Sequence, residues 1–448
     1  MGSHETRDPA TPSACWSEER AEHHLRSLDL FGMRFGLHRM RVLMSELGDP
    51  ERAFDSIHVL GTNGKSSTTR MIAAILARHG LRTASYTSPH LVDYRERVEI
   101  GERELSADEF AAAVQHAAAA AARVEAALGR EERVTQFEEL TAAAFWAIAR
   151  ERVQVAAIEA GLGGRYDATS VVAANVTVLT NVALEHTRWL GSTVAEIAEE
   201  KLAVVQPGGV LALGAGLAPE ALGVAERVAR EREARVVHAD LSRAQPPLRA
   251  QGAFQRANFA LARVAAEAYL EQLEPGRASG PEHERALREA AADTEMAGRF
   301  YTIARDPLTL LDGAHNPAAV DVLVDSLDAV LDGRALTLVF GVLEDKDAAT
   351  MLARLLPACE RAWLTEPRSK RARSSGELAK MAIEMGFDRI AVEPRASAAL
   401  LAAQRFAKRR RGAVLATGSV YLVGELIADL RARVPREEPA VSRRSALA

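Results

Sequence analysis

Short apolar runs rich in β-branched residues alternate along this chain with longer segments whose apolar residues recur at the helical period. Four such runs lie before residue 220: "IHVL", "VQVAAIEAGLGG", "NVTVLTNV" and "GGVLALG". A second set begins near residue 300: "FYTIARDPLTLLDGA", "ALTLVFGVL", "RAWLTEP", "RIAVEP" and "AVLATGS". Regular alternation of strand and helix predicts βαβ units, and therefore an α/β fold with mostly parallel sheets covered by helices on both faces.

The two sets of strands are separated by a stretch that starts with polar and turn-forming residues, "EPGRASGPEHERALREAAADTEMAG". Such a shift in composition is typical of a domain boundary, which we place near residues 294–298. We expect an N-terminal tail over residues 1–27, a first domain over 28–295, a smaller second domain over 296–430 and a C-terminal tail over 431–448.

The composition narrows the kinds of partner. The 448 residues carry a net charge of only −5, with 48% apolar and 26% charged residues, so neither a nucleic acid nor a membrane is expected as the main partner. There is no run of about 18 uninterrupted apolar residues, and Cys15 and Cys359 lie far apart without metal-type spacing. We expect a cytoplasmic protein. The sequence does not determine the oligomeric state, for which a monomer is our expectation.

The stretch "SIHVLGTNGKSSTTRMIAAILARHG", residues 56–80, has the pattern of strand, glycine loop and helix. It departs from the strict phosphate-loop pattern, because two residues rather than four separate Gly61 from Gly64. A loop of this kind binds phosphate through backbone N–H groups, the helix N-terminus and a lysine, here Lys65. The hydroxyls that follow, from residues 66–68, suit Mg²⁺. The alternative is a glycine-containing turn with an incidental lysine.

Metal-type and catalytic-type residues also follow later strands. Glu159 ends one apolar run, Asp167 lies in the glycine turn after it, His186 follows the next run, and Lys201 lies in the helix beyond. Open α/β sheets bind ligands at the carboxyl ends of their strands, so a common site is expected there. Taken singly, Glu159 is more often a cap or an ion-pair partner, and His186 a hydrogen-bonded turn residue.

An ordered series of motifs carries a family resemblance. It comprises "FGLHRMRVLMSELGDP", "IHVLGTNGKSSTT", "YTSPHLVDYRERV", "TQFEELTAAAF", "IEAGLGGRYDAT", "TNVALEHTRWLGSTVAEIAEEK", "FQRANFALA", "GRF", "LLDGAHNPAA", "VFGVLEDKD" and "ATGSVYLVGE". From about residue 28 to about residue 425, the chain resembles the Mur ligase superfamily and, within it, folylpolyglutamate synthase and dihydrofolate synthase. Members carry the shortened loop G-T-N-G-K. The resemblance implies an N-terminal P-loop-type ligase domain and a smaller Rossmann-like C-terminal domain.

The resemblance also implies an activity. The family uses ATP to join an amino acid, here L-glutamate, to the carboxylate of a pterin or folate through an acyl phosphate. Two Mg²⁺ ions are expected with ATP. Lys201 matches a lysine that is carbamylated in the family, which turns an ammonium into a carboxylate that supports a metal.

Carried over position by position, the resemblance implies four groups of site residues. ATP is expected to contact Thr62, Asn63, Gly64, Lys65, Ser66, Ser67, Asn258, Arg299 and Asp312. Metal ligands are expected at Ser67, Ser88, Glu159 and His186. The pterin-bearing substrate is expected near Thr135, Tyr166, Asp167 and Ala168. Catalytic roles are expected for Lys65 on the β- and γ-phosphates, His315 toward the γ-phosphate, Lys201 through its carbamate, and Asp167 as an acceptor of the proton of the incoming ammonium.

Two residues depart from the usual pattern of the family. Ser66 stands where most relatives have glycine, which predicts a narrower range of backbone φ in the loop, and Glu185 stands where they have aspartate. Two other functions stay open: a ligase of the same superfamily that acts on a different carboxylate, and a nucleotide-binding protein without ligase activity. The presence of His186, Lys201 and His315 disfavours the second.

Overall fold

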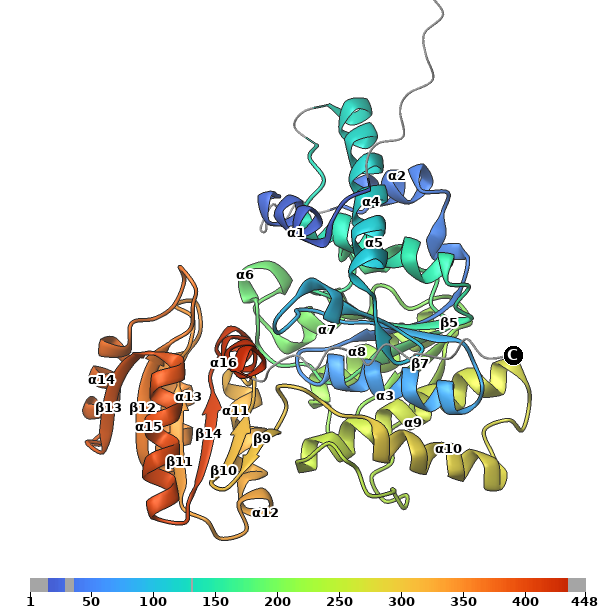
Figure 1. Cartoon of the computed structure of the whole chain (residues 1–448). Helices are drawn as coiled ribbons and strands as arrows, with labels where there is room; N and C mark the ends of the chain where they lie inside the picture. Colours follow the sequence, from blue (N-terminus) through green and yellow to red (C-terminus); the bar gives the residue numbers. More distant parts are fainter. Residues whose placement is uncertain (1–14, 29–35, 130–131, 434–448) are drawn as a thin grey trace, which may run out of the picture. The chain divides into compact units, whose positions relative to one another are not determined.

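The computed structural model describes residues 15–28, 36–129 and 132–433 (Figure 1). Contacts between residues divide the chain into two compact units, Met1–Met296 and Ala297–Ala448. None of the described helices is long and apolar enough to cross a membrane. Each unit is built on one sheet with helices packed on it, which confirms the predicted α/β class with mostly parallel strands.

The first unit contains an eight-stranded sheet in the order β4-β3-β2-β5-β1-β6-β7-β8. Neighbouring strands run parallel except for β2–β3 and β3–β4, which are antiparallel. The strand bounds are β1 Asp55–Leu60, β2 Thr83–Tyr86, β3 Val98–Ile100, β4 Arg103–Glu104, β5 Val155–Glu159, β6 Val176–Leu179, β7 Val210–Leu213 and β8 Arg235–His238. Since β1 lies near the middle, the loop that follows it opens at the centre of the sheet edge.

Alternate residues of the central strands face two different helical layers. In β5, Ala156 and Ile158 pack with one cluster, whereas Val155 and Ala157 pack with another, as the two-residue period of a strand requires. The first cluster includes helices α1 Glu18–Ser27, α2 His38–Glu46, α4 Ala107–Leu128 and α5 Gln136–Arg150; the second includes α3 Lys65–Arg78, α9 Ala253–Leu273 and α10 Gly280–Asp293. Helices α6 Thr187–Leu190, α7 Val194–Leu202 and α8 Pro219–Glu231 complete the unit.

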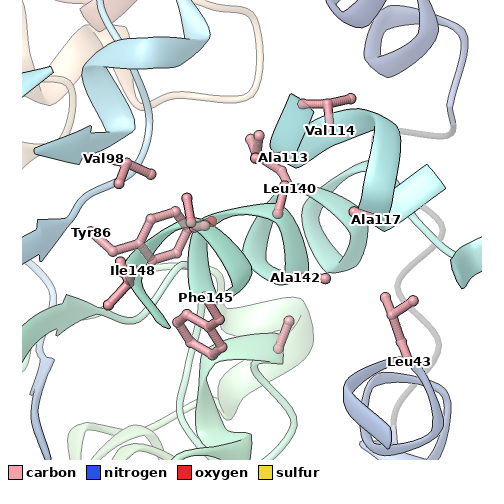
Figure 2. Packing of buried hydrophobic residues seen from close by; sticks show 14 of the residues in the cluster. Leu43, Tyr86, Val98, Ala113, Val114, Ala117, Leu140, Ala142, Phe145 and Ile148 are labelled. Carbon is pink, nitrogen blue, oxygen red and sulfur yellow. The ribbon is translucent and has the colours of Figure 1, made fainter. Parts of the chain in front are cut away.

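Helix α5 lies at the centre of the first cluster (Figure 2). Phe145 is fully buried, and its ring meets the rings of Phe54 and Tyr86 edge-on at centroid distances of 5.9 and 6.2 Å. Edge-on contacts of this kind stabilise aromatic pairs beyond the burial of their area. The capping box of Thr135 and Glu138 fixes where α5 begins, so the packing also places the polar residues at its first turn.

The predicted N-terminal tail over residues 1–27 is wrong for its second half. Residues 18–27 form α1, which begins at the cap Ser17 and packs on α4. Ala21 and Leu25 are fully buried in the first cluster. Their spacing of four residues puts them on one helical face, a signal too short to stand out among polar neighbours. Residues 1–14 and most of the predicted C-terminal tail, 434–448, lie outside the described residues.

The second unit contains a six-stranded sheet in the order β13-β12-β11-β14-β10-β9. Only the β9–β10 pair is antiparallel, so the run predicted over "FYTIARDPLTLLDGA" is a hairpin of two strands. The strand bounds are β9 Tyr301–Arg305, β10 Leu308–Leu311, β11 Leu336–Phe340, β12 Cys359–Glu366, β13 Ile390–Arg395 and β14 Ala413–Thr417. The helices are α11 Pro317–Asp325, α12 Leu327–Leu331, α13 Ala348–Leu355, α14 Ser375–Glu384, α15 Ala396–Arg409 and α16 Val420–Arg433.

The burial of α1 gives a stability prediction. Leu25→Ala removes a fully buried side chain, so we expect the free energy of unfolding of the first unit to fall by about 2–5 kcal/mol. Leu241→Ala, at a leucine that is 54% exposed, is the matched control and is expected to change it little. Urea denaturation followed by circular dichroism measures both. Equal stability of the two variants would mean that residues 18–27 do not pack on the protein.

Candidate active site

The loop after β1 depends on two glycines. Gly61 has φ of 144°, and a Cβ there would lie 1.8 Å from the Thr180 hydroxyl oxygen. Gly64 caps α3 in the left-handed region, with φ of 82°, and a Cβ there would lie 2.5 Å from Oδ1 of Asn258. Both positions combine close approach with a φ that other residues rarely adopt. The short loop therefore reaches the start of α3 with one glycine at each end.

The segment after β6 holds this loop in place. The Thr62 N–H donates to the Asn181 carbonyl at 3.0 Å, and the Asn63 N–H donates to the Asn181 side-chain oxygen at 2.9 Å. The Thr180 hydroxyl donates to the Asn63 carbonyl at 2.7 Å. Because these N–H groups are engaged within the protein, Thr62 and Asn63 shape the loop, and the start of α3 presents the N–H groups suited to an anion. Thr180 and Asn181 belong to the motif "TNV", but the sequence did not predict that these residues hold the loop.

Two lysines meet at one carbonyl. Lys65 Nζ donates to the carbonyls of Gly61 and Thr62, each at 3.1 Å, and Lys201 Nζ donates to the same Gly61 carbonyl at 2.9 Å. Lys201 is buried, at 4% exposure. Burial, together with the charge of Lys65, lowers the pKa of Lys201 to about 7. A glycine turn places this lysine, since a Cβ on Gly164 would lie 2.4 Å from the Lys201 carbonyl oxygen.

Glu159, at the end of β5, is held by two hydrogen bonds from different elements. The Ser66 hydroxyl in the first turn of α3 donates to its Oε1 at 3.0 Å, and the Ser88 N–H donates to its Oε2 at 3.0 Å. Glu159 is 2% exposed. Ser66 lies within the helix and is not among the residues with positive φ, so the predicted restriction on the loop backbone does not arise.

The other predicted metal ligands lie on separate elements. Ser67 is buried in the first turn of α3. His186 caps α6 with φ of 50°, uncommon for a residue other than glycine, and its Nε2 lies 3.8 Å from a Glu185 oxygen. In the part of the chain that the structure describes, no group of three or more His, Cys, Asp or Glu is arranged to hold a metal ion. Serine, carboxylate and imidazole fit a hard cation when phosphate and water oxygens complete its shell.

A buried turn brings together the residues expected near the substrate. Asp167 accepts hydrogen bonds from the N–H groups of Leu162 at 2.7 Å and Thr169 at 3.0 Å, and from the Thr169 hydroxyl. Burial raises the pKa of Asp167. Tyr166 beside it is 46% exposed. Both oxygens of Asp167 are thus engaged in shaping the turn, which favours a positioning role over proton transfer.

Two further contacts extend this turn. His58 in β1 lies with its Nε2 2.9 Å from the Thr169 hydroxyl oxygen, and burial lowers the pKa of His58 to about 4. Since the Thr169 hydroxyl donates to Asp167, a neutral His58 donates to Thr169. Phe137, two residues after Thr135, packs against Gly161, where a Cβ would meet its ring at 2.5 Å. The start of α5 and the turn therefore lie side by side. The sequence did not single out His58 or Phe137.

Three predicted residues cluster in the second unit, where β10 ends. Asp312 accepts hydrogen bonds from the N–H groups of Phe300 at 2.9 Å and Ala314 at 2.8 Å. Burial raises the pKa of Asp312, and the charge of Arg299 opposes this effect. His315 Nδ1 donates to the Gly313 carbonyl at 2.9 Å, which fixes the ring. A Cβ on Gly313 would lie 2.4 Å from the Arg299 guanidinium, so Arg299 and His315 both lie against Gly313.

Comparisons of the sequence with known proteins identify both units. Residues 59–209 match the Mur ligase middle domain, and residues 298–420 match the Mur ligase glutamate ligase domain. Dihydrofolate synthase/folylpolyglutamate synthase of Escherichia coli K12 is 33% identical over 78% of this chain and 81% of its own. A probable bifunctional folylpolyglutamate synthase/dihydropteroate synthase of Haloferax volcanii is 36% identical over 75% of this chain, which spans only 41% of that protein.

Solved structures of similar proteins agree in fold. Folylpolyglutamate synthase of Mycobacterium tuberculosis, complexed with ADP, has a TM-score of 0.84 and 30% identity, over 94% of this chain and 99% of that one. Escherichia coli FolC in complex with DHPP and ADP has a TM-score of 0.81 and 28% identity, over 94% and 100%. The bifunctional Yersinia pestis enzyme, complexed with AMPPNP and Mn ion, has a TM-score of 0.78 and 28% identity, over 94% and 100%.

The lowered pKa of Lys201 predicts a pH-dependent stability. The folded protein binds this proton less tightly than the unfolded chain, so a charged Lys201 lowers the free energy of unfolding. This penalty is full below pH 7 and disappears as pH rises toward 10.5. Lys201→Met removes the penalty. We expect the variant to gain stability over the parent at pH 6, and this gain to shrink by about 4 kcal/mol at pH 10, at 1.36 kcal/mol per pKa unit.

Urea denaturation in CO₂-free buffer at pH 6 and pH 10 measures the difference. Lys380→Met is the matched control, because the Lys380 side chain is 79% exposed on α14. The control is expected to differ from the parent equally at both pH values. A Lys201→Met effect that is the same at pH 6 and pH 10 contradicts the lowered pKa.

Proposed function

Because the chain belongs to the Mur ligase family and, within it, to the folylpolyglutamate synthases and dihydrofolate synthases, we propose that it uses ATP to join L-glutamate to a folate-type carboxylate. The acceptor is dihydropteroate, a tetrahydrofolate, or both in turn. The observation that carries the proposal is the assembly around the Gly61–Gly64 loop, where two lysines share the Gly61 carbonyl and Ser66 binds Glu159. The loop proposed to bind phosphate is thereby connected to a buried carboxylate through the helix that follows it.

The chemistry begins with a poor acylating agent. The substrate carboxylate attacks the γ-phosphorus of ATP, ADP leaves, and an acyl phosphate forms. The amino group of glutamate, after losing a proton, attacks the acyl carbon, and inorganic phosphate leaves from the tetrahedral intermediate. Both steps bring anions together, so they depend on neutralising and positioning phosphate oxygens.

We propose residues for this positioning in each unit, taken by itself. Lys65, Ser67 and the backbone N–H groups at the start of α3, including that of Ser66, are proposed to bind the β- and γ-phosphates, with Asn258 beside Gly64. In the second unit, Arg299 and Asp312 are proposed to bind ATP, and His315 the γ-phosphate. The fixed His315 ring supports this, because its Nδ1 is bound to Gly313. Thr135, Tyr166 and Ala168 are proposed to contact the pterin, on the turn that Asp167 shapes.

ATP and a divalent metal are the cofactors, and the finer proposal is two Mg²⁺ ions held by Ser67, Ser88, Glu159 and His186. A bound divalent cation neutralises phosphate charge and orients the triphosphate. The donor types fit, since hard oxygen ligands and an imidazole leave room for phosphate and water. Cytoplasmic location and a monomeric state complete the proposal.

Lys201 is proposed to carry a carbamate. The ammonium first loses a proton; the neutral amine then attacks CO₂, a nitrogen–carbon bond forms and a second proton is released, so a cation becomes an anion. The low pKa supports this, because a lysine with a pKa of about 7 has a substantial neutral fraction at neutral pH. The change also replaces repulsion between Lys201 and Lys65 with attraction.

One assay tests the reaction. Purified protein with ATP, Mg²⁺ and L-glutamate is offered dihydropteroate and, separately, tetrahydrofolate. We expect ADP release that depends on the pterin, and a product heavier by one glutamate residue, followed by mass spectrometry. Lys65→Ala is expected to lower the rate by a factor of 100 or more, because one phosphate contact made in the transition state is lost. Glutamate added to neither pterin refutes the folate assignment and favours a different carboxylate.

A second assay tests the carbamate. Lys201→Ala is expected to lose most activity, and added acetate or bicarbonate is expected to restore part of it by placing a small carboxylate in the vacated space. The same additions to Lys65→Ala serve as the control and should restore nothing. Full activity of Lys201→Ala without additives shows that the carbamate is not needed.

A further inference from the structure

The Ser66 hydroxyl is hydrogen-bonded to a side chain outside the glycine loop. It crosses from the first turn of α3 to Oε1 of Glu159 at 3.0 Å, while the Ser88 N–H bonds Oε2 at the same distance. Ser66 is part-buried, and Glu159 is almost completely buried, at 2% exposure. The carboxylate is therefore held at both oxygens, by one donor from α3 and one from the loop after β2.

We propose that Ser66 is a positioning residue that orients the Glu159 carboxylate for a divalent cation and thereby links the phosphate loop to the metal site. The inference rests on the proposed function, in which Glu159 is a metal ligand. Each carboxylate oxygen accepts two bonds, so the Ser66 hydrogen bond and a cation can share one carboxylate. Losing such an orienting partner typically weakens metal binding by about 10–100-fold.

The local backbone makes this role available to serine. Ser66 is the second residue of α3 and has helical geometry, whereas Gly61 and Gly64 carry the positive φ of the loop. A glycine at position 66 would remove the hydroxyl that donates to Glu159 from the first turn of α3. Serine therefore adds an interaction at no cost in backbone strain.

A purely structural role for this hydrogen bond predicts a different outcome. A donor that only satisfies a buried carboxylate affects folding stability and leaves cation affinity unchanged. A donor that orients a ligand affects the cation directly. The test therefore measures metal binding in a complex that does not turn over.

The experiment is a Mn²⁺ titration of the full chain with saturating AMPPNP, followed by electron paramagnetic resonance of free Mn²⁺. Ser66→Ala is expected to raise the Kd for Mn²⁺ at least about 10-fold, and Ser66→Thr, which keeps a hydroxyl, is expected to stay within about 2-fold of the parent. Ser45→Ala, at an exposed serine of α2, is the matched control and should match the parent. AMPPNP affinity without metal is expected to be the same in all four proteins, because each keeps the backbone N–H of residue 66 at the start of α3.

Three results overturn the inference. They are a Mn²⁺ affinity of Ser66→Ala equal to that of the parent, a Ser66→Thr protein as weak as Ser66→Ala at equal thermal stability, and a loss of metal-free AMPPNP affinity in Ser66→Ala that accounts for its weaker Mn²⁺ binding. A parent protein that binds neither AMPPNP nor Mn²⁺ contradicts the proposed function itself. That outcome is distinct, because it appears before any variant is compared.

Discussion

The site depends on how closely two backbone segments approach at Gly61. A single added carbon would lie 1.8 Å from the Thr180 hydroxyl, so only glycine lets β1 turn beside the end of β6. This approach allows Asn181 to bind the N–H groups of Thr62 and Asn63, which fixes the path of the loop. Helix α3 then begins at Lys65, which sets where Lys65 and Ser66 lie. The glycine at the start of the short loop is thus required by the packing of β1 beside β6.

Two lysines lie close together at this loop. Lys65 and Lys201 both donate to the Gly61 carbonyl, although Lys201 is buried and repelled by its neighbour. Folding stability alone does not explain such a pair, because removing water from a charged amine costs free energy that one carbonyl does not return. The proposed function explains the pair, because in it a phosphate offsets the charge of Lys65 and a carbamate reverses the charge of Lys201. A buried lysine whose pKa is lowered, such as Lys201, therefore marks a candidate functional site.

Much of this was predictable from the sequence, and the rest failed for physical reasons. Strands such as β1 and β5 are short and apolar, so composition marks them, and their position after strands together with the family resemblance made Lys65, Glu159 and Lys201 site candidates. Helix α1 was missed because only Ala21 and Leu25 mark its buried face. Side-chain hydrogen bonds across the fold, such as Ser66 with Glu159, leave no trace in sequence order, because the partners lie 93 residues apart. A pattern locates a residue on an element, whereas its partner depends on the packing of two elements.

The same limit explains Asp167 and gives β1 a second role. A carboxylate in a glycine turn is a candidate base, yet both oxygens of Asp167 accept hydrogen bonds from the turn. The Thr169 hydroxyl, which donates one of these bonds, accepts a hydrogen bond from His58. His58 lies in β1, three residues before Gly61. One strand therefore fixes the loop proposed for phosphate at its end and the turn proposed for the pterin through its side chain. Because His58 and Thr169 are buried, a shift of β1 would displace the loop and the turn together, so a single element sets the geometry of the two proposed sites.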